Sequence, residues 1–213
     1  MINMLVSGQI ALFVLIVIAL VLSLSFHEFG HAAVAKLFGD DTAQRSGRLT
    51  LNPLAHVDPM GLLMVVLVGF GWAKPVPTNP RNFTSRSADL WVAAAGPGMN
   101  LLVAFIAVNF YSLSVQAEWS LAQSPGAEIF FYYLATINLT LMLFNLIPLG
   151  VLDGHYILPH FLSSGAATAY RDFNARYGNM ALMSLVLLSF VGVPVFRFIF
   201  GIGRTLLAHL RIF

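Results

Sequence analysis

Two histidines and a glutamate lie close together near the end of the first apolar stretch of this 213-residue chain. His27 and His31 are four residues apart, so on a helix they share one face, with Cβ atoms roughly 5–6 Å apart. That geometry allows two imidazoles to bind one zinc ion, and Glu28 projects close enough to act on a water molecule beside it. The pattern therefore predicts a metal centre that is equipped with a general base.

The alternative interpretation is a polar helix end that happens to contain two histidines. No charged side chain occurs from Met1 through Phe26, so Glu28 follows a long uncharged run. A carboxylate in that position is costly in lipid, and ionisable residues inside membranes usually have a function. We therefore favour the metal centre, with one Zn²⁺ per chain.

A third metal ligand is needed, because a catalytic zinc site has three protein ligands and one open position. The chain has no cysteine, so this ligand must be a histidine or a carboxylate. Asp153 is the leading candidate, since it follows the uncharged interval 129–152. Pro148 and Gly150 should break the helix there and let the carboxylate turn inward. The competing interpretation of Asp153 is an ordinary N-cap for a helix that begins at Gly154.

The composition indicates a membrane protein. Hydrophobic residues make up 58% of the sequence and charged residues 9%, against roughly 25% charged in an ordinary soluble domain. These values exclude the soluble globular, disordered and fibrous classes. The 11 Lys+Arg exceed the 9 Asp+Glu by too little for a phosphate-binding surface, so we expect no nucleic acid among the partners.

Uncharged intervals predict how the chain crosses the bilayer, because a spanning helix needs roughly 20 apolar residues. Four intervals reach that length: 1–26, 90–117, 129–152 and 177–196. A fifth interval, 59–73, is shorter and contains three glycines, which favours a re-entrant segment. We expect an all-α polytopic membrane protein, a bundle of about five to six transmembrane or re-entrant helices that forms one domain over 1–213.

The segment between 38 and 88 does not have this helical character. Residues 48–51 alternate between polar and apolar, and Pro75 and Pro77 favour an extended chain. We therefore expect a short strand-like, membrane-associated segment here, either separate strands or a hairpin.

Basic residues predict the orientation of the spans. All of those before Arg171 fall between 36 and 86, whereas 114–127 contains none. Since cytoplasmic loops carry the excess of Lys and Arg, 38–88 is expected in the cytoplasm and both 114–127 and the N-terminus outside.

Three motifs occur together in this sequence. They are His27-Glu-Phe-Gly-His31, Ala95-Gly-Pro-Gly-Met-Asn100, and Asn145-Leu-Ile-Pro-Leu-Gly-Val-Leu-Asp153-Gly154, with Leu51-Asn-Pro53, Asp58-Pro59 and Gly71-Trp-Ala-Lys-Pro-Val76 between them. In combination they resemble the site-2 protease family of intramembrane zinc metalloproteases, over Ile10 to Gly154. The chain departs from the family at Gly150 and Val151, where prolines are common. Neither a PDZ nor a CBS domain is recognisable in the sequence, so it resembles the minimal form.

The resemblance implies His27, His31 and Asp153 as the zinc ligands and Glu28 as the catalytic base. Zinc would polarise the scissile carbonyl and lower the pKa of water from 15.7 toward about 7. Glu28 would accept the water proton and return it to the leaving amine.

The tetrahedral oxyanion of this reaction needs a donor besides the metal. Asn100 is the first candidate and Asn145 the second, although asparagines also form hydrogen bonds between helices in membrane bundles. Asn138 is expected to pack or to line a water path. His56 and Asp58 form a pair that could assist the site, and His155 could support Asp153.

The implied activity is hydrolysis of peptide bonds in or near transmembrane segments of other membrane proteins, as in regulated intramembrane proteolysis. The expected partners are a transmembrane protein substrate and the lipid bilayer. The expected location is integral and multi-pass, in a prokaryotic cell membrane.

Two other functions compete with this one. A Ste24-like membrane metalloprotease also has His-Glu-x-x-His but takes a downstream glutamate as third ligand. Here only Glu118 and Glu128 could serve, and both flank the external loop. A non-enzymatic zinc carrier or membrane scaffold would not require Glu28 between the histidines.

Overall fold

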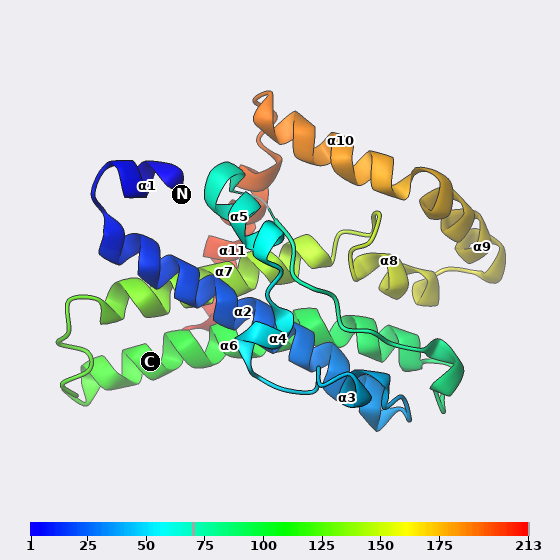
Figure 1. Ribbon diagram of the computed structural model, residues 1–213, viewed down its shortest axis with the longest axis horizontal. Coiled ribbons are helices and arrows are strands. Elements are labelled where there is room, and N and C mark those ends of the chain that lie inside the picture. Colours follow the sequence, from blue (N-terminus) through cyan, green and yellow to red (C-terminus); the bar gives the residue numbers. More distant parts are fainter. Residues whose placement is uncertain (70, 213) are drawn as a thin grey trace.

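The computed structural model describes residues 1–69 and 71–212, and its regular structure in this part of the chain is helical (Figure 1). The α-helices are α1 (Ile2–Val6), α2 (Ile10–Leu37), α3 (Thr42–Arg45), α4 (Pro53–His56), α5 (Pro59–Val68), α6 (Ala88–Gln116), α7 (Ala127–Asn145), α8 (Gly154–Ile157), α9 (Ser164–Phe173), α10 (Asn179–Phe190) and α11 (Val195–Leu210). Two short 3₁₀ turns, η1 (Pro80–Asn82) and η2 (Leu158–Phe161), and a π-helical turn, η3 (Asn174–Gly178), complete the set. The all-α class expected from the sequence is confirmed.

Three helices, α2, α6 and α7, are long and apolar enough to cross a membrane. Helix α2 has 28 residues and is therefore about 42 Å long, more than the roughly 30 Å of the hydrocarbon layer. The three run antiparallel in chain order, so that the N-terminus of α2 and the α6–α7 loop lie at one end (Figure 1). The loop after α2 and the loop after α7 lie at the other end.

Small residues let these three helices approach closely. Ala19 of α2, Ala104 and Ala107 of α6, and Ala135 of α7 are each at most 3% exposed, and they pack around the fully buried Leu139. In lipid there is no hydrophobic driving force between helices, so close van der Waals packing of small side chains is a main source of association. The bundle is the rigid frame on which the site residues stand.

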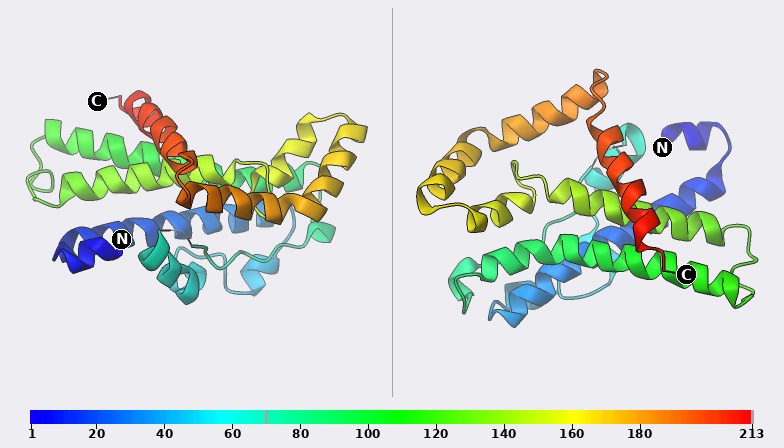
Figure 2. Two further views of the ribbon diagram at one scale, coloured as in Figure 1. Left: turned by 90° about the horizontal axis from the view of Figure 1, so that it is seen from above. Right: turned by 180° about the vertical axis from the view of Figure 1, so that it is seen from behind.

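The other elements lie on two faces of this bundle. The segment from α3 to α5 lies against α2, and α11 crosses the opposite face, where it packs on α7 and α6 (Figure 2). Helices α9 and α10 join through η3 into a bent arm beside the bundle. The interval 177–196, expected to span the membrane, contains the end of η3, the 12-residue α10 and the first residues of α11. A bundle of five to six spanning or re-entrant helices thus stays a prediction beyond the three long ones.

The expectation of strands or a hairpin between 38 and 88 is wrong for the described residues, which contain no strand there. Pro75 and Pro77 have no N–H to donate to a ladder. The backbone groups of Lys74 also bond outside any ladder: its amide donates to the His56 carbonyl at 2.8 Å, and its carbonyl accepts from Arg48 Nη2 at 2.5 Å. The segment instead contains the short helices α3, α4 and α5 and the turn η1, and 71–79 is a coil, whose Val76 amide donates to Glu28 of α2 at 2.9 Å.

Helix α5 has the form expected of a re-entrant segment. It has only 10 residues and ends at Gly69, whose φ of 83° is in the left-handed region that glycine adopts without strain. The chain then turns back along the helix, and a Cβ on Gly61 would overlap the Trp72 carbonyl. The backbone of α5 at Gly61 is therefore in contact with the backbone of the returning chain at Trp72.

Asp40 anchors the far end of this coil to α2. Its buried carboxylate accepts hydrogen bonds from the Asn79 amide at 2.6 Å, from Asn82 Nδ2 at 2.8 Å and from Thr42. Burial by itself would raise the pKa of this carboxyl, but the hydrogen bonds lower it below its usual range. Asp40 therefore holds its charge and keeps the coil in place.

The antiparallel arrangement yields a prediction about orientation. This chain has no cysteine; the exposed Ser46 follows α3, after the C-terminal end of α2, and the exposed Gln123 is in the α6–α7 loop, near the N-terminal end of α2. A cysteine placed at Ser46 should react with an impermeant maleimide only from the cytoplasmic side, and one at Gln123 only from outside. Labelling of intact cells and of inverted vesicles measures this, and the reverse pattern would overturn the orientation.

Candidate metal centre

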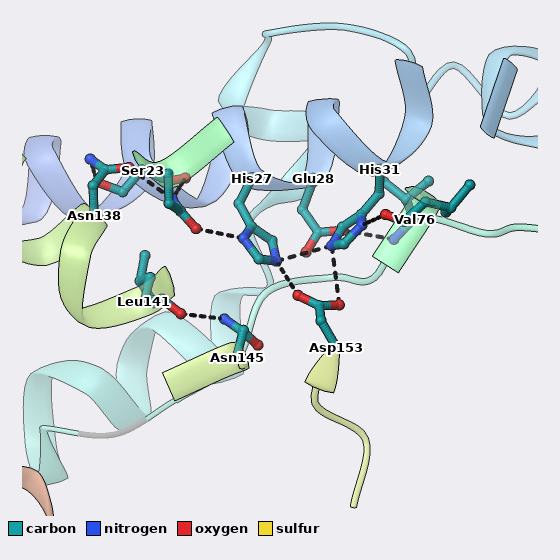
Figure 3. Close-up of polar contacts among 11 residues, drawn as sticks. Ser23, His27, Glu28, His31, Val76, Asn138, Leu141, Asn145 and Asp153 are labelled. Atoms are coloured by element: carbon teal, nitrogen blue, oxygen red, sulfur yellow. Dashed lines mark hydrogen bonds and ion pairs between the residues drawn. The ribbon is translucent and has the colours of Figure 1, made fainter. Parts of the chain in front are cut away.

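Helix α2 brings the two histidines to one point. The Nε2 atoms of His27 and His31 lie 3.1 Å apart, and the ring centroids are 4.7 Å apart. His27 is buried and His31 nearly so. The four-residue spacing therefore has the effect predicted from the sequence: both rings leave the same face and converge on one position (Figure 3).

Asp153 meets the pair from the segment after α7. Its Oδ1 lies 3.3 Å from His31 Nε2, and its Oδ2 lies 3.3 Å from His27 Nε2. It does occupy the N-cap position of α8, but its side chain makes no capping hydrogen bond. The carboxylate is turned to the histidines instead, as the metal-ligand interpretation of this residue requires.

The loop that carries Asp153 depends on a left-handed turn. Gly150 has φ 62° and its amide and carbonyl are both bonded to the Asn174 side chain. Proline, with φ fixed near −65°, could not adopt this conformation. The chain can therefore take this path because position 150 is glycine rather than the proline that is common in the family.

The spacing of the ligand groups suits a zinc ion. For ligands at about 2.0–2.1 Å from a tetrahedral zinc, the ligand-to-ligand distance is about 3.3 Å; the two Nε2 atoms lie 3.1 Å apart, and each lies 3.3 Å from one of the two Asp153 carboxylate oxygens. Both Nδ1 atoms point at acceptors, Asn100 Oδ1 at 2.6 Å and the Val92 carbonyl at 2.7 Å, so both carry hydrogen. In the neutral form of each ring the Nε2 lone pairs then face each other, and Asp153 Oδ2 is buried without a hydrogen-bond partner. A cation between these atoms satisfies all of them.

Glu28 lies beside this cluster but is not part of it. Its side chain is 8% exposed, and Oε2 accepts a hydrogen bond from the Val76 amide at 2.9 Å. Arg48 is also buried and close enough to interact electrostatically with Glu28; burial lowers the pKa of its guanidinium, and the Glu28 charge acts in the opposite sense. The carboxylate is therefore fixed near the metal position by a backbone donor from the coil.

The two candidate oxyanion donors differ in what they contact. Asn100 is fully buried, accepts from His27, and uses both amide hydrogens on the Ser23 carbonyl and Asn138 Oδ1. Asn145, at the end of α7, donates one amide hydrogen to the Leu141 carbonyl at 2.9 Å and is half-buried. In Figure 3 its amide lies on the side of the cluster from which Asp153 approaches.

The weaker site candidates have structural partners instead. His56 is fully buried and bonds the Thr50 carbonyl at 2.7 Å, while Asp58 caps α5 by accepting from the Gly61 amide. The rings of His155 and Tyr170 are tilted against each other with centroids 5.8 Å apart, and burial lowers the pKa of His155. None of these contacts of His56, Asp58 and His155 involves His27, His31 or Asp153.

Glu118 and Glu128 lie far from the histidines. Glu128 is in the first turn of α7, whose 19 residues extend about 28 Å, whereas Asp153 follows the last turn. Among the described residues, the group of His27, His31 and Asp153 is the one whose ligand atoms all lie within 4.8 Å of one another. The geometry disfavours the glutamate-ligand alternative.

A glycine in α6 makes room for the rings. A Cβ on Gly96 would overlap His31 Nε2 and approach His27 Cε1 to 2.6 Å. Only a residue without a side chain fits there, because the imidazoles lie against the α6 backbone. Several partners of the site could not be read from the sequence, among them this contact, the Val92 carbonyl and the Val76 amide.

Comparison with known proteins identifies the family. The model of peptidase family M50 matches residues 15–119 and 112–192. YwhC of Bacillus subtilis (strain 168), classed by name as a zinc metalloprotease, is 44% identical over 155 residues, which is 70% of each chain. The chain belongs to peptidase family M50. As an M50 protease it is a zinc metallopeptidase of the site-2 protease type, and its apolar helices make it a membrane protein.

More distant M50 relatives carry the same designation. Rip2 of Mycolicibacterium smegmatis is 34% identical over 163 residues, covering 72% of this chain and 60% of Rip2. Rip2 of Mycobacterium tuberculosis (strain H37Rv) is 31% identical over 154 residues, covering 70% of this chain and 58% of its own length. No solved structure matches this M50 chain significantly.

The contact between Gly96 and the imidazoles yields a prediction. Gly96→Ala should displace one or both rings and reduce the zinc content of the purified protein at least tenfold, measured by elemental analysis in detergent. Gly98→Ala is the matched control, since it lies on the same helix and its Cβ would meet no atom within 4 Å. Equal zinc in both variants would contradict the proposed fit of the site.

Proposed function

We propose that this M50 protease cleaves peptide bonds in or near transmembrane segments of other membrane proteins, as in regulated intramembrane proteolysis. We also propose that it is a multi-pass protein of a prokaryotic cell membrane, as its bacterial relatives suggest. The observation that carries the proposal is the depth of the catalytic group. His27 is preceded by 17 residues of α2, or about 25 Å of helix, and followed by 10 more.

A site at this depth determines the kind of substrate. A peptide bond must come to the metal position, inside the length of a spanning helix, so a bond in a substrate's own membrane segment is the nearest one available. The carbonyl of an intact helix is hydrogen-bonded and shielded by neighbouring side chains. The substrate must therefore unwind locally before it is cut.

Catalysis is divided among the chain's own groups. His27, His31 and Asp153 would hold zinc, which when bound polarises the scissile carbonyl and lowers the pKa of water. Glu28 accepts the water proton and passes it to the leaving amine. Since Oε2 is held by the Val76 amide, we assign the transfer to Oε1.

We assign oxyanion stabilisation to Asn145 rather than to Asn100. An amide group has two N–H donors, and Asn145 has one given to Leu141, which leaves one for the substrate. Asn100 has both engaged inside the bundle and would have to break a buried hydrogen bond. Its place is behind His27, as the acceptor that orients the ring.

The role of Glu28 separates a protease from a zinc carrier. Glu28→Gln keeps the size and the acceptor for Val76 but cannot take a proton, so zinc should stay near one per chain while cleavage falls about 10²–10⁴-fold. The assay is cleavage of single-span bacterial membrane proteins, trimmed of their external domains, in detergent with and without chelator. A Glu28→Gln protein that cleaves at the wild-type rate would refute the mechanism.

Asp153 is the ligand that distinguishes this site from a glutamate-ligand site. Asp153→Ala removes a ligand at 3.3 Å from each histidine, so zinc content should fall and cleavage should be lost. The combined change Glu118→Gln and Glu128→Gln is the control and should leave both unchanged. Zinc retained in the first variant and lost in the second would favour the Ste24-like arrangement.

A further inference from the structure

A chain of buried polar groups runs behind the metal ligands and joins the three long helices. Ser23 of α2, Asn100 of α6 and Asn138 of α7 are each 0% exposed. In an apolar bundle every such group must be hydrogen-bonded, because an unpaired donor or acceptor loses its hydration with no return. The partners of each atom therefore fix which way each amide points.

The first link is Asn138. Its Nδ2 lies 2.8 Å from the Leu134 carbonyl, which can only accept, and 2.7 Å from Ser23 Oγ. The Ser23 hydroxyl donates its own hydrogen to the Ala19 carbonyl at 2.7 Å, so its oxygen accepts from Asn138. Both hydrogens of Asn138 are thus directed to these two acceptors, and Oδ1 is the atom left facing α6.

The second link is Asn100. Because Asn138 presents an oxygen, the atom of Asn100 that faces it at 2.8 Å must be Nδ2, whose other hydrogen goes to the Ser23 carbonyl at 3.2 Å. The Oδ1 of Asn100 is then turned to His27 Nδ1, at 2.6 Å. An oxygen there requires hydrogen on Nδ1 and leaves the lone pair of His27 on Nε2, toward Asp153 and His31.

We propose that Asn138 and Ser23 are positioning residues for the metal site: they orient the Asn100 amide, and through it they hold His27 with Nε2 ready to bind zinc. This inference rests on the proposed zinc site. It extends the set of residues on which metal binding depends to Asn138 of α7 (Figure 3).

His31 shows why His27 needs this arrangement. The Nδ1 of His31 donates to the backbone carbonyl of Val92, which can only accept and therefore sets the ring by itself. A side-chain amide has a donor end and an acceptor end of nearly equal shape, so it orients a histidine only if its own direction is fixed. Asn138 and Ser23 supply that direction.

The test compares substitutions by zinc affinity, measured by chelator competition on the folded, detergent-solubilised protein. Groups that orient a zinc-binding histidine typically contribute 10–100-fold to affinity. Asn100→Leu should weaken zinc binding by that factor and Asn138→Leu by about tenfold, since it leaves Asn100 free to turn. Ser23→Ala, a smaller change expected to fold normally, should weaken binding a few-fold.

Two further variants separate positioning from general stability. Asn138→Asp keeps an acceptor for Asn100 Nδ2, so it should retain near wild-type affinity even if the protein unfolds at a lower temperature. Asn109→Leu is the control. Asn109 is buried and lies on α6, as Asn100 does, but its Nδ2 donates to the carbonyls of Phe105 and Leu210, away from the site. It should lower the thermal midpoint and leave zinc affinity within twofold of the wild type.

The outcomes are distinct. Zinc affinity that simply follows the thermal midpoint through all these variants, or an Asn138→Leu protein with wild-type affinity, would overturn the positioning role while leaving the zinc site intact. Unchanged zinc affinity in His27→Ala would instead overturn the zinc site itself. Loss of affinity in Asn138→Leu, with recovery in Asn138→Asp, supports the proposal.

Discussion

The structure depends on one local requirement: two imidazole nitrogens and a carboxylate lie about 3 Å apart inside an apolar bundle, where a shared cation satisfies all of them. His27 Nε2, His31 Nε2 and the Asp153 carboxylate have separations of 3.1–3.3 Å. Unpaired polar atoms at this depth would destabilise the bundle, because burial removes their hydration without a protein partner to replace it. The geometry of the metal site and the packing of the three long helices therefore depend on the same residues.

Small residues and buried polar residues contribute to this arrangement in different ways. The alanines of α2, α6 and α7 and the absent side chain of Gly96 bring the backbones close enough for ligands from different segments to meet. The buried amides then occupy the space between the helices and direct the rings. Substitutions at Gly96 and at Asn138 would therefore affect the same ligands. A side chain at position 96 would displace the imidazole rings. Loss of the Asn138 amide would leave the orientation of the His27 ring unfixed.

The coil between α5 and α6 connects the site to the exterior of the bundle. It is fixed to α2 at its far end by Asp40, and near the catalytic centre its Val76 amide donates to Glu28. Pro75 and Pro77 have no N–H group, so Val76 has the one backbone donor in the stretch 75–77. The same prolines disfavour a regular strand and leave the Val76 amide to bond Glu28. A substrate that approaches Glu28 must share this space with the coil.

The sequence by itself determined the membrane class, the long helices and the likeliest chemistry, because these depend on local spacing: uncharged runs of spanning length, and two histidines one helical turn apart around a glutamate. It also singled out Asp153, although the distance between this carboxylate and His27 is set by chain reversal at the end of α7. Only the tertiary structure decided that Asn100 turns its oxygen to His27, that Asn138 fixes that direction, and that the coil forms no strand. Those features depend on which atoms of distant segments meet, and hydrogen-bond partners across three helices leave no periodic trace in the sequence.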